Sequence, residues 1–151
     1  MKHSILGAVL IAAASGAMAD VDASNPARLY DLLRSEGYAV ELGNDSLGDP
    51  KISGKSDGTA FQIYFYDCTD NVDCRTIQFQ VAFDLNQGME FSKANNWNAE
   101  KRYAVVYLDD EMDPFLQMDL NIDYGVSEEN FLDNFKMWTK VMGEFEDFID
   151  W

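Results

Sequence analysis

Two cysteines, Cys68 and Cys74, are the most chemically informative residues of this 151-residue chain. Redox-active pairs usually have the spacing C-x-x-C at the start of a helix, whereas five residues separate these two thiols. In an exported chain an even number of cysteines favours a disulfide. Closing so short a loop stabilises the folded state by about 2 kcal/mol. We therefore expect a disulfide that clamps one turn, with a redox pair as the alternative.

Histidine chemistry is absent from most of the chain, because His3 is the only histidine and it lies near the N-terminus. If the N-terminal segment is removed on export, neither Ser-His-Asp nor Cys-His catalysis is possible. Zinc sites that use histidine are excluded in the same way. The sequence also contains neither a G-x-G-x-x-G motif nor a P-loop. We expect a protein without catalytic residues or cofactors.

Carboxylates are numerous, and Asp109, Glu111 and Asp113 have the spacing of the first three ligands in an EF-hand. The sixth position of that loop requires glycine and is Pro114, and the twelfth requires glutamate and is Leu120. The loop between the cysteines fails the same test. Paired carboxylates can also cleave glycosidic bonds, but with 27 acidic residues a pair proves nothing. We expect solvated acidic turns and no metal site.

The formal net charge of −16 limits the range of partners. Without Lys2 the chain has ten basic against 27 acidic side chains, a net charge of −17. Nucleic acids and anionic membrane surfaces bind through Lys and Arg, so both are disfavoured as partners. The acidity is explained either by solubility or by docking to a basic partner.

The N-terminus has the three parts of a secretory signal peptide. Lys2 and His3 form a basic start, an apolar run extends from Ile5 to Ala14, and Ala17-Met18-Ala19 is a small-residue cleavage site. The apolar run is shorter than the roughly 20 residues that a membrane-spanning helix requires. The alternative, a buried N-terminal helix, would require a larger protein around it.

Cleavage after Ala19 divides the chain into a signal peptide, residues 1–19, and one domain, residues 20–151. The next residue is Asp20, so the cysteine that anchors a bacterial lipoprotein is missing. No later segment is apolar for long enough to insert into a membrane. We expect a periplasmic or secreted protein.

The elements that carry these residues include two predicted β-hairpins. Phe61, Ile63 and Phe65 alternate with polar residues, which indicates a strand with one buried face. The loop between the cysteines joins this strand to the next, and an acidic turn at residues 109–114 joins the second pair. The predicted strands are 61–66, 77–83, 103–108 and 116–122, with weaker signals at 38–42 and 51–54.

Three helices are predicted. Ser24 or Asn25 can cap the first, which has Pro26 at its first position and ends near Gly37. The second covers residues 86–100. The third begins after Ser127 and continues for about 24 residues. Its apolar stripe consists of Phe131, Phe135, Trp138, Met142, Phe145 and Ile149, widened by Leu132, Val141 and Phe148. The order of elements predicts an α+β fold in which helices pack on one face of a twisted antiparallel sheet.

One segment has a possible recognition pattern. Asn96, Trp97 and Asn98 lie together near the end of the second predicted helix, and Arg102 follows. Either the asparagines cap the helix and Trp97 fills the core, or the segment is an exposed binding patch, since Trp and Arg are enriched at interface hot spots. Both interpretations stay open, and these four residues are the candidate binding site.

The order of several motifs resembles the YbjN-domain family. These motifs are Asn96-Trp97-Asn98, Arg102, the strand through Tyr107-Leu108-Asp109, the strand Met118-Asp119-Leu120, the approach Gly125-Val126-Ser127 and the short Cys68 to Cys74 loop. The resemblance implies a fold like that of type III secretion chaperones, which are often dimeric. It also implies a sensory or regulatory role without an assigned reaction.

Three functions are consistent with these observations. The first is a non-enzymatic, chaperone-like or regulatory binding protein of the cell envelope that holds a protein or peptide segment and, as the resemblance implies, forms a homodimer. The second is an acidic inhibitor or stress-protective protein that neutralises a basic partner. The third, a carboxylate-based hydrolase, has the least support because a domain of this size offers little room for a sugar cleft.

Overall fold

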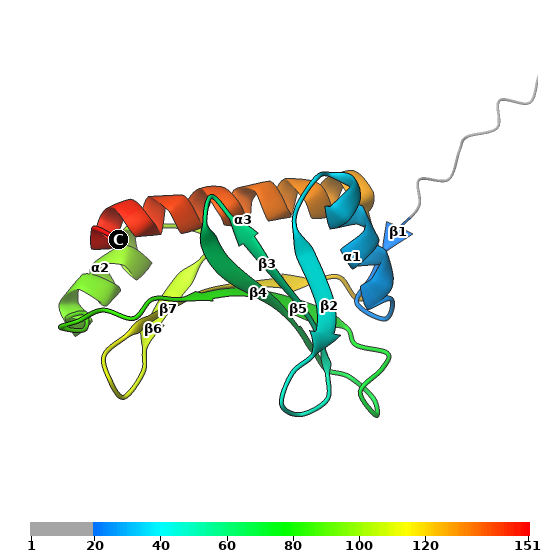
Figure 1. The fold of residues 1–151 in the computed structure, drawn as a ribbon, viewed down its shortest axis with the longest axis horizontal. Coiled ribbons are helices and arrows are strands. Elements are labelled where there is room, and N and C mark those ends of the chain that lie inside the picture. Colours follow the sequence, from blue (N-terminus) through cyan, green and yellow to red (C-terminus); the bar gives the residue numbers. More distant parts are fainter. Residues whose placement is uncertain (1–19) are drawn as a thin grey trace, which may run out of the picture.

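The computed structural model describes residues 20–151, so the predicted signal peptide lies outside the described residues. The elements are β1 (Asp20–Val21), α1 (Pro26–Ser35), β2 (Val40–Asn44), β3 (Pro50–Ser56), β4 (Thr59–Tyr66), β5 (Thr76–Ala82), α2 (Phe91–Glu100), β6 (Val105–Leu108), β7 (Pro114–Asn121), β8 (Val126–Ser127) and α3 (Glu128–Ile149). Figure 1 shows α3 lying along one side of the strands. None of the helices in this part of the chain is long and apolar enough to cross a membrane.

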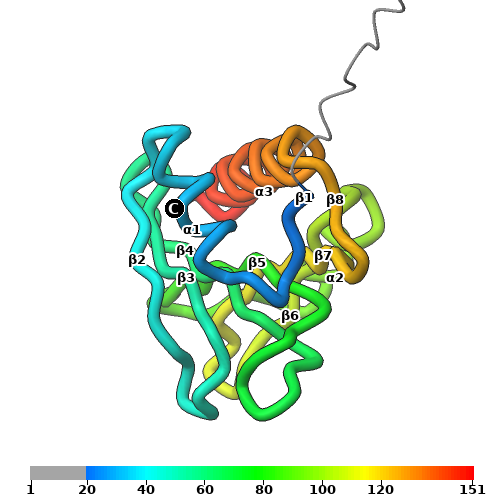
Figure 2. The backbone as a smooth tube through the Cα atoms, turned by 90° about the vertical axis from the view of Figure 1, so that its right-hand side faces the viewer, coloured from blue at the N-terminus to red at the C-terminus, as the bar shows by residue number. Residues whose placement is uncertain are grey.

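Six strands form one antiparallel sheet in the order β2-β3-β4-β5-β7-β6, and β1 pairs with β8 in a separate two-stranded sheet. This arrangement confirms the predicted α+β fold with an antiparallel sheet. In the perpendicular view of Figure 2, α3 extends along the top, with β2 on one side and the β1–β8 pair on the other. The six-stranded sheet therefore has one face covered by helix.

The core lies between α3 and the inward side chains of β4 and β5. As the alternation predicted, Phe61, Ile63 and Phe65 are fully buried, and so are Ile77 and Phe79 of the next strand. Because side chains alternate between the faces of a strand, the intervening polar residues point to the opposite face.

The long helix places its aromatic stripe directly on these strands. The side chain of Ser127 caps α3 by accepting a hydrogen bond from the amide of Asn130 at 3.2 Å, as predicted. The ring of Phe135 lies 5.5 Å from that of Phe61, and Trp138 stacks on Phe79 at 5.7 Å. Aromatic pairs of this kind contribute about 0.5–1.5 kcal/mol beyond the area they bury.

The first helix also begins and ends as predicted. Of the two proposed caps, Asn25 is the one used, because its side chain accepts a hydrogen bond from the amide of Arg28. Gly37 follows the helix with φ +92°, a conformation that favours glycine.

Two predicted boundaries were wrong. The second helix begins at Phe91 rather than Asn86, because Gly88 has φ +63° and the amide of Met89 donates to the carbonyl of Met112 in the acidic turn. Phe91 is consequently 70% exposed instead of packed in the core. The following strand begins at Val105 rather than 103, since the residue at 103 has φ +75°. The short β1–β8 pair was not predicted.

Candidate functional site: the open face of the sheet

The face of the sheet opposite α3 is lined by the outward side chains of five strands. The strand register brings these residues into rows, for example Lys51, Tyr64, Gln78 and Asp119 across β3, β4, β5 and β7. We name this surface the open face, and it consists of Lys51, Ser53, Gln62, Tyr64, Tyr66, Gln78, Gln80, Val105, Tyr107, Phe115, Gln117 and Asp119. Only the inward faces of these strands contribute to the core, so the open face is available to solvent.

Hydrogen bonds between side chains fix the centre of the open face. The amide nitrogen of Gln78 donates to Asp119 at 2.8 Å, and that of Gln117 donates to the amide oxygen of Gln78 at 2.9 Å. On the β3 side, the hydroxyl of Ser53 donates to Gln62 at 2.6 Å. These bonds link β7 to β5 and β3 to β4, so the polar side chains of the face are held in fixed positions.

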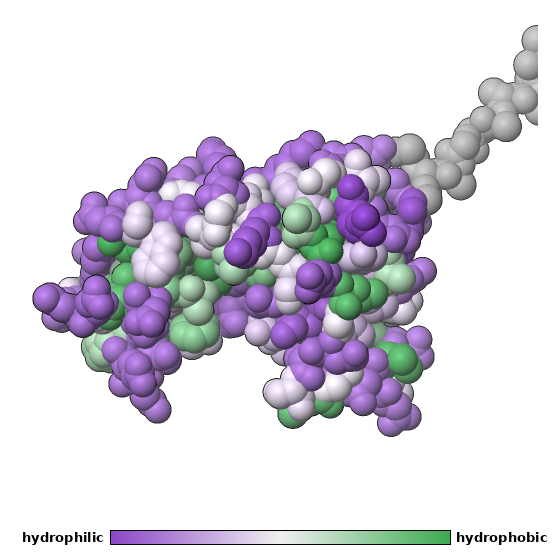
Figure 3. Space-filling model, viewed as in Figure 1, coloured by the Kyte–Doolittle hydropathy of each residue, from purple (hydrophilic) through white to green (hydrophobic). Residues whose placement is uncertain are grey.

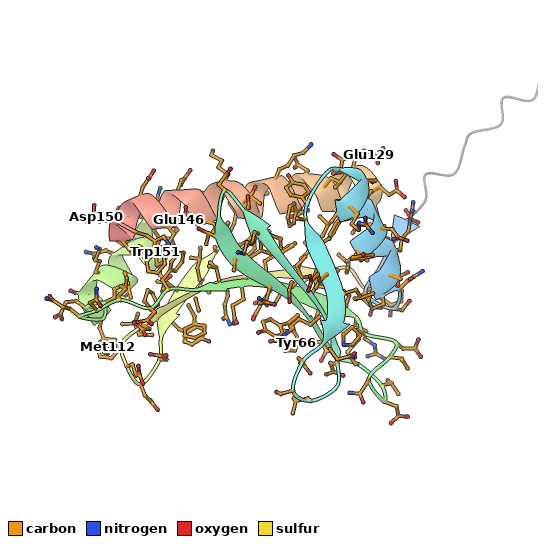
Figure 4. The ribbon with its side chains drawn as sticks, in the orientation of Figure 1. Tyr66, Met112, Glu129, Glu146, Asp150 and Trp151 are labelled. Atoms are coloured by element: carbon orange, nitrogen blue, oxygen red, sulfur yellow. A yellow bond between two sulfur atoms is a disulfide. The ribbon has the colours of Figure 1, made fainter. Side chains whose placement is uncertain are left out.

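Exposed aromatic and apolar side chains lie on both sides of this polar centre. Tyr66 on β4 is 42% exposed, and on β6 Tyr107 is 43% and Val105 is 54% exposed. The ring of Tyr107 stacks on that of Phe115 at 5.0 Å, while the rings of Tyr64 and Tyr66 lie 6.4 Å apart. In Figure 4, Tyr66 lies below the strands, on the side away from α3.

The hydroxyl groups of these tyrosines share one electrostatic environment. Burial is the largest cause that raises the pKa of Tyr66, followed by the negative charges of Tyr64 and Asp119, with a further effect of Tyr107. Burial also raises the pKa of Tyr107, followed by the charge of Asp109 and then that of Tyr64. Tyr107 thus contributes to the raised pKa of Tyr66, and Tyr64 to the raised pKa of Tyr107, although β4 and β6 are not adjacent.

One end of the open face is bordered by the loop between β4 and β5, residues 67–75, which we name the disulfide loop. The predicted Cys68–Cys74 disulfide is confirmed. At the tip, Thr69 and Val72 exchange two backbone hydrogen bonds around a two-residue turn whose central residues both have positive φ. Such a turn matches the twist of the strands on either side of it. The disulfide thus closes a small hairpin of its own.

The disulfide loop is tied to its neighbour, the β2–β3 loop at residues 45–49. The side chain of Asn71 donates to the carboxylate of Asp49 at 2.8 Å and to the carbonyl of Leu47 at 3.2 Å. In Figure 1 both loops project below the sheet on one side. Together they form one border of the open face.

The acidic turn at residues 109–114 forms the other border. The carboxylate of Asp109 accepts hydrogen bonds from the amides of Glu111 and Asp113, each at 2.9 Å. A second carboxylate, that of Asp113, accepts from the amide of Leu85 at 2.8 Å. Figure 1 shows this turn, between β6 and β7, projecting on the side opposite the two loops, and Figure 3 shows the surface hollowed between them.

A cleft of about 710 Å³ meets the open face at its β2–β3 border. Its lining includes Ser53 and Gln62 of the open face together with Arg34 of α1 and Tyr38, which follows that helix. The cleft is therefore continuous with the open face, and its charged lining residues are Arg34, Lys55 and Glu41.

Comparison with known proteins gives a family for this geometry. A family model described as "YbjN: Putative bacterial sensory transduction regulator" matches residues 25–151. The chain belongs to the YbjN family. No curated protein and no solved structure matches the chain. The open face, both of its borders and all three helices lie within the part of the chain that the YbjN model covers.

Within this YbjN domain, the predicted segment around Trp97 has a clear structural role. Trp97 is 1% exposed and packs edge-to-face on Phe145 with the ring centroids 4.8 Å apart. Its indole nitrogen donates to the carbonyl of Ala104 at 3.3 Å. Asn98 donates to the carbonyl of Val106 at 3.0 Å and accepts from the amide of the same residue at 2.8 Å. Trp97 and Asn98 thus attach α2 to the core and to β6.

The other two predicted binding residues, Asn96 and Arg102, are exposed. Neither forms a hydrogen bond or an ion pair with another side chain among residues 20–151. They lie in and after α2, outside the open face. A binding role for Asn96, Trp97, Asn98 and Arg102 stays a prediction.

Among the described residues, no group of three or more His, Cys, Asp or Glu side chains is placed to hold a metal ion. The tyrosines of the open face were not singled out from the sequence. The alternation of β4 did indicate that Tyr64 and Tyr66 point away from the core, but their position on the same face as Tyr107 depends on the order and register of the strands.

Proposed function

We propose that this YbjN-family protein is a non-enzymatic binding protein that holds a segment of a partner protein on its open face, and that it regulates the partner in this way. The observation that carries the proposal is the exposure of aromatic and apolar side chains on both sides of the polar centre, Tyr66 on β4 and Val105 with Tyr107 on β6. Neighbouring exposed apolar side chains, such as Val105 and Tyr107, are typical of interaction surfaces. Tyrosine is also among the residues enriched at the centres of interfaces.

The chemistry of the open face supports binding rather than catalysis. The amides of Gln78 and Gln117 and the carboxylate of Asp119 are joined in one hydrogen-bonded chain, which suits a fixed recognition surface. Asp109 and Asp113 accept hydrogen bonds from backbone amides and so stabilise the acidic turn. The family description, a regulator of sensory transduction, is consistent with a role in binding.

The proposed setting is the periplasm or the exterior of a bacterial cell, reached after cleavage behind Ala19. The disulfide of the β4–β5 loop supports this setting, because disulfides persist in oxidising compartments. Homodimer formation is also part of the proposal, and sedimentation analysis of the mature chain tests it.

Site-specific crosslinking in the native host tests the proposal. A photoreactive phenylalanine analogue replaces Tyr66 on the open face in one strain and Tyr124 in the other. Tyr124 is the matched control, because it is an aromatic residue that is 97% exposed and lies in the turn between β7 and β8. We expect a discrete crosslinked partner at position 66 that is absent at position 124, and direct binding of that purified partner by calorimetry. Equal crosslinking at both positions, or none at position 66, would refute the proposal.

The second candidate function is neutralisation of a basic enzyme or toxin, and the excess of 27 acidic over ten basic side chains favours it. Complementary charges would accelerate association and make it strongly dependent on salt. Stopped-flow association rates at increasing ionic strength test this candidate. Rates that do not change with salt would exclude it.

A further inference from the structure

We infer that the segment bound on the open face is extended and rich in Lys or Arg. This inference rests on the proposed function and specifies the chemistry of the partner. It follows from the charges that border the open face and from the exposed tyrosine rings within it.

Negative charge is concentrated at both borders of the open face. The β2–β3 loop contains two carboxylates, the disulfide loop three and the acidic turn four, and Asp119 adds one within the face. Lys51 and Lys55 lie on this side of β3, and Arg75 lies in the disulfide loop, so three basic side chains accompany these ten carboxylates. A segment that lies across the face therefore meets carboxylates at each end, which attract a cationic partner.

Several of the chain's own basic residues are already engaged on the helical side. Arg28 pairs with Glu128, and Lys101 pairs with Glu144 at 2.8 Å. Lys93 lies over the ring of Phe148, with its ammonium nitrogen 5.1 Å from the ring centroid. Arg28, Lys93 and Lys101 therefore do not neutralise the carboxylates at the borders of the open face.

The tyrosine rings of the open face are suited to cations. Lys51 shows the interaction within the chain itself, because its ammonium nitrogen lies 5.9 Å from the centre of the Tyr64 ring. Tyr66 and Tyr107 are exposed, and among residues 20–151 no basic side chain lies over either ring. A cation over an exposed aromatic ring contributes about 0.5–1 kcal/mol. Both rings are available to basic side chains of a partner.

The strand order and the register set the relative position of the two rings. Tyr66 is on β4 and Tyr107 is on β6, and these strands are separated by β5 and β7. Tyr66 is paired with Thr76 of β5, whereas the row of Tyr107 runs through Phe115 to Ala82 of β5, six residues further along that strand. The two rings are therefore offset both across and along the strands. An extended segment with several basic residues that runs diagonally over the face can place one of them over each ring.

A second copy of this chain does not fit the open face as well. A symmetric dimer through this surface would place the same carboxylates of both copies opposite one another. Like charges at an interface are unfavourable, so the homodimer that we expect uses another surface. The charge argument thus selects a basic segment as the occupant.

Three synthetic peptides of ten residues, labelled with fluorescein, provide the test. Each is composed of Gly and Ser, with four Arg residues, four Glu residues or no charged residue. Fluorescence anisotropy with the chain lacking residues 1–19 measures binding at 20 and 150 mM salt. We expect the arginine peptide to bind, more tightly at the lower salt concentration, and the other two to bind at least ten-fold more weakly. Equal affinity for the arginine and uncharged peptides, or binding of the glutamate peptide, would overturn the inference.

Variants of the tyrosines locate the binding. Tyr66→Ala and Tyr107→Ala should each weaken binding of the arginine peptide about two- to five-fold, which corresponds to one exposed cation–π contact. Tyr124→Ala should leave binding unchanged, and circular dichroism of each variant confirms that it is folded. If all three variants bind alike, the open face is not the site.

A charge-matched pair of variants separates a local effect from the overall charge. The double variant Asp110→Asn, Glu111→Gln removes two carboxylates from the acidic turn, and Asp133→Asn, Asp147→Asn removes two from exposed positions on α3. Both have the same net charge, yet the first should weaken peptide binding at least two-fold more than the second. Equal losses would reduce the effect to non-specific attraction and overturn the inference.

The crosslinking at position 66 tests the inference about charge separately from the proposed function. A captured partner whose crosslinked segment is neutral or acidic would overturn the inference about charge and leave the proposed function intact. Failure to capture a partner at position 66 would count against the proposed function itself.

Discussion

Truncation of Trp97 is the most decisive test of how α2 is held. Complete burial of a tryptophan removes roughly 200 Å² from water, which is worth about 5 kcal/mol. An alanine retains part of that burial, so Trp97→Ala should lower the free energy of unfolding by about 4 kcal/mol. The conservative variant Trp97→Phe keeps most of the ring but removes the donor to the Ala104 carbonyl, and should cost about 2 kcal/mol. For a domain of this size, 2 kcal/mol corresponds to a fall of about 7 °C in Tm.

Urea unfolding followed by far-ultraviolet circular dichroism measures these changes, with the slope of each transition checked for two-state behaviour. Phe91→Ala is the matched control, because Phe91 is on the same helix and 70% exposed, and it should change stability by less than about 0.5 kcal/mol. The reasoning would be refuted if Trp97→Phe unfolded at the same urea concentration as the wild type while losing ten-fold in partner affinity. Trp97 would then be a recognition residue rather than a structural one.

Three further predictions concern the sheet and its loops. The double variant Cys68→Ser, Cys74→Ser should lower the free energy of unfolding by about 2 kcal/mol, measured by urea titration, and an unchanged midpoint would mean that the disulfide does not constrain the unfolded chain. Gly54→Ala should lower the free energy of unfolding by about 1–3 kcal/mol, because the added Cβ would lie 2.7 Å from the ring of Phe61. The control is Gly43→Ala on β2, where no atom lies within 4 Å of the added Cβ. The pKa values of Tyr66 and Tyr107 are raised in the folded state, so these hydroxyl groups ionise at a lower pH in the unfolded chain than in the folded one. The neutral tyrosines therefore contribute fully to stability below pH 10, and this contribution is lost as the pH rises through the pKa values of the folded state. Unfolding at pH 8 and pH 11 should show a smaller loss for the double Tyr→Phe variant than for the wild type, and equal losses would contradict this.

Much of the fold was predictable because the strongest sequence patterns coincide with the core. The alternation of Phe61, Ile63 and Phe65 identified β4, and the aromatic spacing from Phe131 to Ile149 identified α3. These patterns report burial directly, since period two and period 3.6 arise from the geometry of one strand or one helix. They remain valid without knowledge of the neighbouring elements.

The features that were missed depend on contacts between distant segments. The start of α2 is set by a hydrogen bond between Met89 and Met112, which no local pattern reveals. Most of the candidate site escaped prediction for the same reason. Tyr66 and Tyr107 are 41 positions apart in the sequence and share one surface only because β7 lies between β5 and β6. The segment around Trp97 was noticed for its unusual composition, and its role in attaching α2 agrees with one of the two interpretations made from the sequence.

Because the core lies on one side of the sheet, substitutions on the two faces of the sheet differ in their effect on the fold. Replacing the ring of Phe79 or Trp138 would disturb the packing of α3 on the sheet, whereas Tyr66, Val105 and Tyr107 are each at least 42% exposed and have few neighbours to lose. The three exposed residues can therefore be replaced without loss of the fold. Proteins built on the same six strands could thus acquire quite different targets, and the scaffold offers protein engineers a platform on which new specificities can be selected.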